Sequence, residues 1–363
     1  MHRRHALLAL AAGARPAMAW ARPAAALHFP RDHGSHPTFA TEWWYLTGQA
    51  RADGALWGFQ ITFFRSRVDV AAGLRSAFAA RQLLFAHAAL TDLRGRRQLH
   101  DQRIARAGFG VAEASEQDTA IRLQDWTLSR QETDGPGHGR YLIDAPAQGF
   151  ALQLQATGTQ PVLLQGEQGL SRKGPDPAQT SWYVSQPQLA IEGRITLNGR
   201  RMAIEPGERA DNRAWMDHEW SEALMHPDAV GWDWIGMNLQ DGGALTAFVL
   251  RRADASALWA GGSFRPSAQA PVQVFGAGDV GFTPLRWWTS PASGARYPVQ
   301  WRVDTPAGRF QVHALLDDQE LDGSASTGAI YWEGLSELRS AAGQAIGRGY
   351  LEMTGYARPI RLR

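Results

Sequence analysis

The stretch WYLTGQARADGALWGFQITFF (residues 44–64) holds two patterned runs on either side of the dipeptide Asp53-Gly54. In the second run Trp57, Phe59 and Ile61 alternate with small or polar residues. A period of two is that of a β-strand, because successive side chains point to opposite faces. Asp-Gly is a strong signal for a tight hairpin turn. The stretch therefore predicts an antiparallel β-hairpin.

The same pattern recurs along the chain. RQLLFAHAALTDL (81–93) and ALTAFVLRR (244–252) are similar apolar runs, and further turn signals stand at Asn198-Gly199 and Asp322-Gly323. No long segment shows the period of an amphipathic helix. We predict an all-β, mostly antiparallel protein.

A second hairpin resembles the first. WDWIGMNLQDGGALTAFVLR (232–251) repeats the order Trp, Gly four residues later and Asp-Gly nine residues later, at an offset of 188 residues. A chain of 363 residues is also long for one ordinary core. Two consecutive antiparallel barrels of the lipocalin type fit both observations, and such barrels can enclose a small ligand. We expect barrels over residues 27–200 and 201–363.

The composition excludes several classes of protein. Hydrophobic residues make up 44% and charged residues 20%, as in folded proteins. The formal charge is only +2, and no basic stripe is present, so a nucleic-acid partner is not expected. Lys173 is the one lysine among 37 basic residues. With no cysteine, disulfides and thiol nucleophiles are excluded.

The N-terminus predicts export. Residues 1–26 begin with Arg3-Arg4 before a short apolar run and contain the small-residue exit Ala17-Met18-Ala19. This is the layout of a bacterial export signal, and Arg3-Arg4 suggests the twin-arginine type, so we expect a periplasmic or secreted protein. No later apolar run reaches the length of a membrane span, so we expect a soluble mature chain.

The segment AWMDHEW (214–220) is the first candidate for chemistry. On a strand Asp217 and Glu219 share one face, and His218 turns to the other. Two carboxylates ~7 Å apart among aromatic residues repel each other and are desolvated, so one should hold a proton near neutral pH, as a general acid requires. The alternative is that both carboxylates face water or pair with arginine, while His218 caps a turn.

A second polar cluster lies in FPRDHGSHPTFATEWWYLTG (29–48), with Asp32, His33, His36 and Glu42. Two histidines and a carboxylate could ligate a metal. Gly, Ser and Pro around them indicate a loop without a fixed common face, which favours a hydrogen-bonded plug at the barrel end, with a part in catalysis left open. We predict no metal and no cofactor.

Other residues are candidates for the lining of a pocket. Asp233 shares an apolar face with Ile235, as either a satisfied structural group or a second acid, and His87 fits a core histidine. No G-x-S-x-G elbow, P-loop or dinucleotide fingerprint is present. The expected substrate-binding residues are Trp43, Trp44, Tyr45, Tyr183, Trp215, Trp220, Trp232, Asp233, Trp234 and Trp332, with Glu333 and Glu352 as further lining candidates.

Four motifs together resemble a known family. DHGSHPTFATEWWYLTG (32–48), AWMDHEWS (214–221), GWDWIGMNLQDG (231–242) and YWEG with GRGYLEMTGY (331–356) are similar to the lipocalin-like AttH and carotenoid 1,2-hydratase (hydroxyneurosporene synthase) superfamily. The resemblance spans the mature chain and is closest to the exported branch labelled predicted secreted hydrolases. It implies two consecutive calycin-like barrels. Its hydratase branch adds water to a terminal isoprenoid double bond without a cofactor, and a fungal branch resembles pericyclases that bind polyenes.

The resemblance also implies a role for one residue. The aspartate of the hydratase motif falls on Asp217, which would protonate an alkene carbon while aromatic faces stabilise the cation and Glu219 or His218 accepts a proton from water. We expect a hydratase or hydrolase acting on an apolar, isoprenoid- or acyl-like substrate. Two alternatives are a non-enzymatic periplasmic carrier of a hydrophobic ligand and a pericyclase-like polyene binder. The expected partner is a hydrophobic small molecule or lipid, with peripheral membrane contact possible.

Overall fold

The computed structural model describes residues 26–71, 73–135, 137–207, 211–223 and 225–360. All but the last residue of the expected export signal (1–26) lie outside this part of the chain. Among the described residues no helix has the length and apolarity needed to cross a membrane.

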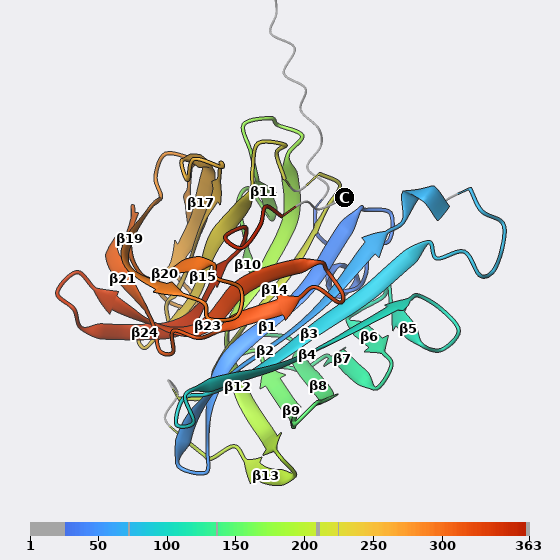
Figure 1. Ribbon diagram of the computed structural model, residues 1–363, viewed down its shortest axis with the longest axis horizontal. Coiled ribbons are helices and arrows are strands. Elements are labelled where there is room, and N and C mark those ends of the chain that lie inside the picture. Colours follow the sequence, from blue (N-terminus) through green and yellow to red (C-terminus); the bar gives the residue numbers. More distant parts are fainter. Residues whose placement is uncertain (1–25, 72, 136, 208–210, 224, 361–363) are drawn as a thin grey trace, which may run out of the picture.

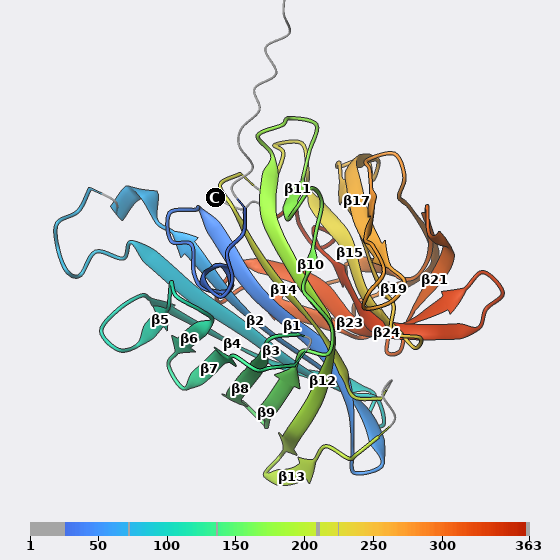
Figure 2. The ribbon, with the colours of Figure 1, turned by 180° about the vertical axis from the view of Figure 1, so that it is seen from behind.

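Fourteen strands form the first sheet, and all of its pairings are antiparallel. Its path runs β4-β3-β2-β1-β14-β12-β9-β8-β7-β6-β5, with β10, β11 and β13 added to β12. β4 returns beside β6 and β8, so the sheet curls into a nearly closed barrel (Figures 1 and 2). The strands are β1 (Thr41–Ala52), β2 (Ala55–Arg67), β3 (Gln82–Asp92), β4 (Arg97–Arg106), β5 (Ala112–Ala114), β6 (Ala120–Leu123), β7 (Trp126–Gln131), β8 (Arg140–Ala147), β9 (Phe150–Thr157), β10 (Leu163–Leu164), β11 (Leu170–Arg172), β12 (Thr180–Leu197), β13 (Arg200–Ala203) and β14 (Arg213–Ser221).

Ten strands form the second sheet, in the order β18-β17-β16-β15-β24-β23-β21-β20-β19, with β22 paired to β23. Two short 3-10 turns, η1 (Arg31–His33) and η2 (Asp69–Ala71), are the helical elements of the described residues, so the all-β prediction is confirmed. The strands are β15 (Gly231–Leu239), β16 (Ala244–Arg251), β17 (Ala257–Arg265), β18 (Gln273–Phe275), β19 (Gly281–Thr289), β20 (Arg296–Thr305), β21 (Gly308–Ala314), β22 (Glu320–Gly323), β23 (Ala329–Ser340) and β24 (Ala345–Met353).

The division between the sheets falls later than expected. The boundary placed between residues 200 and 201 cuts through β13, and both β13 and β14 belong to the first sheet. β14 hydrogen-bonds to β1 on one side and β12 on the other, so it joins the two halves of that sheet. The second sheet begins at Gly231.

The two predicted hairpins form as β1–β2 and β15–β16, but their tryptophans point differently. Trp44 lies in the core of the first barrel, whereas Trp232 faces the space between the sheets. The two hairpins are therefore similar in sequence, but their matching tryptophans point toward different layers of the molecule.

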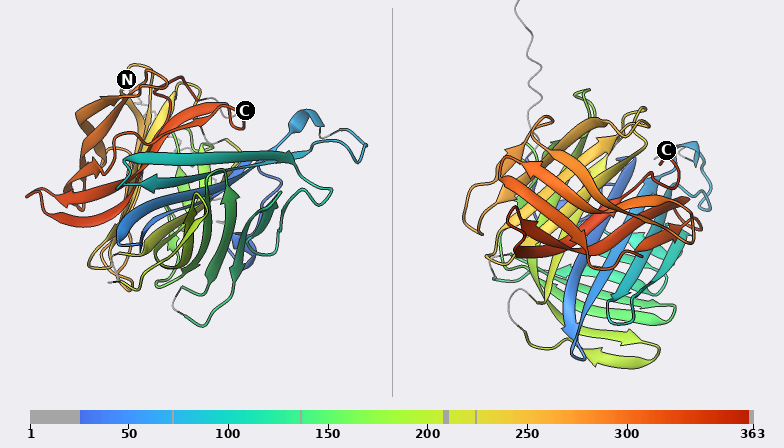
Figure 3. Two further views of the ribbon diagram at one scale, coloured as in Figure 1. Left: turned by 60° about the horizontal axis from the view of Figure 1, so that its bottom comes forward. Right: turned by 60° about the vertical axis from the view of Figure 1, so that its left-hand side comes forward.

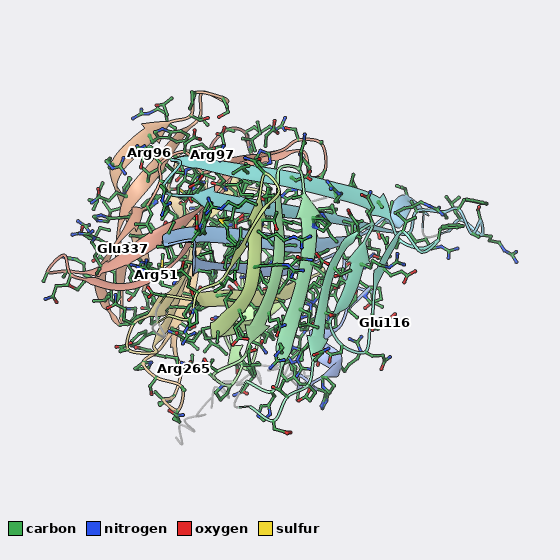
Figure 4. All side chains as sticks on the ribbon, turned by 90° about the horizontal axis from the view of Figure 1, so that it is seen from below. Arg51, Arg96, Arg97, Glu116, Arg265 and Glu337 are labelled. Atoms are coloured by element: carbon green, nitrogen blue, oxygen red, sulfur yellow. The ribbon has the colours of Figure 1, made fainter. Side chains whose placement is uncertain are left out.

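The two sheets meet where β24 lies against β1 and β15 against β14 (Figure 3). A third apolar layer, the inter-sheet layer, lies at this contact. At Gly58 the approach is close, because an added Cβ would lie 2.9 Å from the Tyr350 hydroxyl. Charged side chains such as Arg96 and Glu116 are exposed at the outside of the molecule (Figure 4). The layer is built from Tyr45, Leu163, Trp215, Ala229, Trp234, Ala244, Phe248, Leu250, Leu335 and Tyr350.

Candidate functional site

Asp217 projects from the middle of β14 into the inter-sheet layer. In the register of the sheet it lies between Tyr45 of β1 and Ser185 of β12, on the face that also carries Trp215. Residues at such paired positions share a face and lie within contact distance. The strand thus delivers a carboxylate into an otherwise apolar layer, away from solvent.

Three donors hold the Asp217 carboxylate. The Tyr183 hydroxyl donates to Oδ2 at 2.6 Å, while the Ser185 hydroxyl and Trp215 Nε1 donate to Oδ1 at 2.6 and 2.7 Å. Trp234 Nε1 of the second sheet donates to the Tyr183 hydroxyl at 3.0 Å. The carboxylate is therefore fixed in place and linked by hydrogen bonds to both sheets.

The proton affinity of Asp217 is unusual for a carboxyl group. Burial raises its pKa to about 7, even though the hydrogen bonds from Ser185, Tyr183 and Trp215 act in the opposite direction. Desolvation outweighs these donors because it destabilises the charged form directly. Asp217 can therefore gain and lose a proton near neutral pH, which is the property required of a general acid.

Glu219, the next residue on this face, is paired with a buried lysine. Lys173 Nζ lies 2.9 Å from Glu219 Oε1, and the Ser181 hydroxyl donates to the same oxygen. The ammonium also lies 4.5 Å from the ring centre of Tyr183 and 4.3 Å from that of Phe248. The buried ammonium therefore has one carboxylate and two aromatic faces as its partners.

The second sheet adds two acids to the same layer. Glu333 of β23 lies directly opposite Glu352 of β24; Glu333 is buried and Glu352 is partly buried. Burial, and then the charge of Glu352, raises the pKa of Glu333 well above its ordinary value. Burial also raises the pKa of Glu352 to about 7, while Trp232 Nε1 donates to its Oε2 at 3.0 Å. Both shifts favour the protonated form, as expected where two carboxyl groups share a dry site.

Two buried polar atoms of this layer face each other. The Tyr45 hydroxyl faces Glu333, yet neither it nor Glu333 Oε1 has a hydrogen-bond partner of ordinary geometry among the described residues. The Tyr45 ring meets Trp234 edge-on at 5.4 Å. Buried polar atoms without partners are rare in native proteins and occur at functional sites.

The structure brings together most, but not all, of the residues expected at the site. Glu219 and the aromatic residues Tyr45, Tyr183, Trp215 and Trp234 surround Asp217. Trp43, the cross-strand neighbour of Glu219, and Trp232 are half-buried at the edge of the layer. The expected residues on other faces are His218, Trp44, Trp220, Asp233 and Trp332.

His218 is separated from Asp217 by the backbone of β14. It points into the first barrel, where its ring stacks on Trp44 at 4.6 Å and its Nε2 lies 2.9 Å from Glu42 Oε1. The alternation of the strand predicts this separation. The expectation that His218 takes a proton at the Asp217 site is therefore wrong.

Glu42 is the centre of a buried plug at the end of the first barrel. Its carboxylate accepts hydrogen bonds from the Ser35 hydroxyl at 2.9 Å and from Arg65 Nε at 2.8 Å, and His36 Nδ1 lies 2.8 Å from Oε1. Burial alone would raise the pKa of Glu42, but His218, His36 and Arg65 hold it well below its ordinary value.

The remaining residues of the plug enclose Glu42. His36 Nε2 lies 3.1 Å from Asp32 Oδ1, and the His36 ring stacks on Trp220 at 3.8 Å. His33 is buried, and its carbonyl accepts from Trp44 Nε1 at 3.1 Å.

A metal ion does not suit this plug. One ligand atom from each of His36, Glu42 and His218 lies within 4.8 Å of the others. However, the Arg65 guanidinium already neutralises the Glu42 carboxylate, and a second cation beside it would be repelled.

Asp233 and Trp332 lie on the face of the second sheet that points away from the inter-sheet layer. Asp233 Oδ2 lies 2.8 Å from Arg251 Nε, and the Tyr356 hydroxyl donates to its Oδ1 at 3.0 Å. Trp332 Nε1 donates to the Asp317 carbonyl at 2.7 Å. Asp233 is therefore an ion-paired acid of the second sheet. The expectation that Asp233 and Trp332 lie at the Asp217 site was wrong, because both side chains point away from the inter-sheet layer.

His87 bridges the two sheets. Its Nδ1 lies 2.7 Å from the Tyr331 hydroxyl and its Nε2 lies 2.7 Å from the Ser326 hydroxyl. Both ring nitrogens have partners, and burial lowers the pKa of His87 to about 4, so the ring is neutral. This agrees with a satisfied core histidine.

Lys173 is a residue of the candidate site that no sequence motif marked. A signal was present, because Lys173 is the one lysine in a chain whose other basic residues are all arginine. Its ammonium is buried next to Glu219.

Comparison with known proteins adds the family. A family model described as AttH-like matches residues 20–356. A crystal structure of an AttH protein from Nitrosomonas europaea is 44% identical, with a TM-score of 0.83, and covers 92% of this chain and 98% of that chain.

More distant relatives include a hydratase. Kievitone hydratase from Fusarium solani subsp. phaseoli is 23% identical over 154 residues, and the match spans only 40% of each chain. The crystal structure of kievitone hydratase from Nectria haematococca has a TM-score of 0.68 at 14% identity and covers 92% of this chain and 94% of that one. That of CghA with Sch210972 has a TM-score of 0.53 at 11% identity and covers 90% and 96%. At these identities the two structures show the lipocalin-like fold alone. On the family match and the similar AttH structure, the chain belongs to the AttH-like family.

Proposed function

We propose that this protein is an enzyme that binds an apolar, unsaturated molecule between its two sheets and adds water to it by carboxylic acid catalysis. The observation that carries the proposal is the buried carboxyl group of Asp217, whose pKa lies at about 7 in an aromatic layer. The similarity to kievitone hydratase supports a hydration as the reaction. The isoprenoid- or acyl-like class of the substrate rests on the apolar lining of the layer.

In the proposed reaction protonated Asp217 transfers its proton to one carbon of a carbon–carbon double bond. The neighbouring carbon becomes a cation, which the faces of Trp215 and Trp234 and the carboxylates of Asp217 and Glu219 stabilise. A water molecule attacks that carbon, and its surplus proton returns to Asp217. One water is added, and the acid is regenerated.

The other polar groups of the layer support this step. Lys173 lies 2.9 Å from Glu219 and holds the Glu219 carboxyl group next to the developing cation. Glu333 and the Tyr45 hydroxyl are placed to hydrogen-bond a polar group of the substrate or the attacking water. Glu352, with a pKa of about 7, can return a proton to the cluster.

We also propose that the chain is exported. The N-terminal pattern of residues 1–26 alone supports this, and fractionation of cells that express the full chain would test it.

The test of the proposed function begins with the ligand. The protein is purified from its own cells, its apolar contents are extracted and identified by mass spectrometry, and the extracted molecule is incubated with fresh protein. Wild-type protein should form a product one water heavier, and Asp217→Asn should slow this by about 100- to 10,000-fold. Tyr183→Phe, which removes one donor to Asp217, is the milder companion variant.

Two results would contradict the proposal. If the extracted molecule binds but is returned unchanged under all conditions, the protein is a carrier. If Asp217→Asn converts it at the wild-type rate, the acid lies elsewhere.

A further inference from the structure

A segment between β2 and β3 stands away from the body of the molecule. Residues 68–71, which include η2, and residues 73–81 project beyond the end of the first sheet, at the right of Figure 1 and at the left of Figure 2. The turn between β4 and β5 lies beneath it and contributes Phe109. Nothing in the proposed reaction uses this segment.

The projection exposes large hydrophobic side chains. Val70 is 90% exposed, Phe78 75%, Phe109 61% and Leu74 53%. Phe78 and Phe109 stack on each other with ring centres 5.3 Å apart. We call these four residues the apolar tip. Grouped exposed hydrophobic residues on a soluble protein mark a contact surface.

Arginines surround the tip. The Arg106 guanidinium lies 4.2 Å from the ring centre of Phe109 and 5.6 Å from that of Phe78, and Arg75 and Arg81 are exposed on the projecting segment itself. Within the described part of the chain none of these three arginines forms an ion pair. Their positive charge is therefore available to a partner.

The one acid exposed on the segment is already engaged. Asp69 lies 2.6 Å from Arg67, which also pairs with Glu222. The tip and its surroundings thus combine an apolar end with uncompensated positive charge.

We propose that the apolar tip inserts into the surface of an anionic lipid bilayer. Aromatic and aliphatic side chains enter the boundary between headgroups and acyl chains, and arginines at the same depth contact lipid phosphates. A protein partner fits less well, because a narrow projecting loop offers little of the roughly 800 Å² per partner that a stable protein interface needs. This surface lies outside the inter-sheet site, and the inference does not depend on the proposed hydration.

The position of the tip determines which side of the molecule would face a bound bilayer. β2 ends at Arg67, and its last residues pair with Thr41, which in turn pairs with Ser221 at the end of β14. This is the end of the sheet that carries Trp43 and Glu219. A bilayer bound at the tip would therefore lie on the side of the molecule nearest the half-buried edge of the inter-sheet layer.

Vesicle binding tests the proposal. The full chain is mixed with vesicles of phosphatidylcholine alone or of phosphatidylcholine with phosphatidylglycerol, and the bound fraction is measured by sedimentation. We expect binding to the anionic vesicles, weakened by salt because the arginine contribution is screened. Loss of Phe78 in Phe78→Ser should reduce the partition coefficient roughly tenfold. Loss of charge in Arg75→Gln or Arg81→Gln should reduce it about fivefold each.

The matched controls are Val70→Ser at the tip and Val274→Ser on the second sheet, which replace exposed valines by the same residue. All variants share the same N-terminus, so any contribution of residues 1–25 cancels. Tryptophan fluorescence and thermal unfolding check that each variant is folded.

Three results would overturn the proposal. The first is no binding of the wild-type chain to anionic vesicles. The second is equal loss of binding in Val70→Ser and Val274→Ser. The third is self-association of the wild-type chain, seen by analytical ultracentrifugation, that Phe78→Ser abolishes while vesicle binding persists unchanged.

Discussion

The pH dependence of folding is the sharpest test of the environment of Asp217. Its pKa is raised from 3.8 to about 7 by burial, so between these values the folded state holds a proton that the unfolded state has released. Its contribution to stability is fully present below pH 3.8 and is lost as the pH rises through about 7. About three pH units at ~1.4 kcal/mol each give roughly 4 kcal/mol as an upper limit.

Asp217→Asn removes this titration while keeping the shape of the side chain. The stability of the wild-type protein relative to the variant should therefore fall by up to ~4 kcal/mol between about pH 4 and pH 7, and stay constant above. Urea unfolding at a series of pH values, followed by tryptophan fluorescence, measures the difference.

Asp233→Asn serves as the comparison. Burial raises the pKa of Asp233 to about 6. The difference in stability between wild type and Asp233→Asn should therefore become constant above about pH 6, whereas that for Asp217→Asn becomes constant only above about pH 7. Loss of the partner of Arg251 should also destabilise this variant at every pH. A difference between wild type and Asp217→Asn that does not change with pH would refute the reasoning.

Three further predictions concern the rest of the layer. Lys173→Met should destabilise the fold by about 3–5 kcal/mol, because Glu219 is left buried without its partner, and urea unfolding at neutral pH should show it; an unchanged midpoint would contradict the ion pair. Gly58→Ala should cost about 1–3 kcal/mol in the same assay, since its Cβ would lie 2.9 Å from the Tyr350 hydroxyl, and a neutral effect would mean that the sheets can separate there. Glu333→Gln should change stability at neutral pH by less than about 1 kcal/mol, because an amide replaces a carboxyl whose raised pKa favours the protonated form; a loss of several kcal/mol would show that Glu333 is ionised.

The alternation of strands predicted the local geometry of the site well. It separated Asp217 and Glu219 from His218, and the structure places them on opposite faces of β14. It could not say which face meets which layer, because all residues of β14 are buried and neither face is marked by exposed polar residues.

Residues from distant strands were harder to place from the sequence. Trp332 and Glu333 are adjacent, and only the acid faces the inter-sheet layer. The approach of Glu333 to Glu352 depends on the register of β23 against β24, which no local pattern encodes. The boundary near residue 200 was wrong for a similar reason, since the pairing of β14 with β1 joins strands about 170 residues apart.

The central claim is that Asp217 protonates a carbon atom of the substrate, and the position of deuterium in the product tests it most directly. The apolar molecule extracted from the protein is incubated with the wild-type chain in heavy water, and its product is analysed by mass spectrometry and NMR. If Asp217 protonates carbon, the product carries one deuterium bound to carbon next to the new hydroxyl-bearing carbon, and Asp217→Asn forms almost none of it. A hydrated product without carbon-bound deuterium, or one formed equally by Asp217→Asn, would contradict the account.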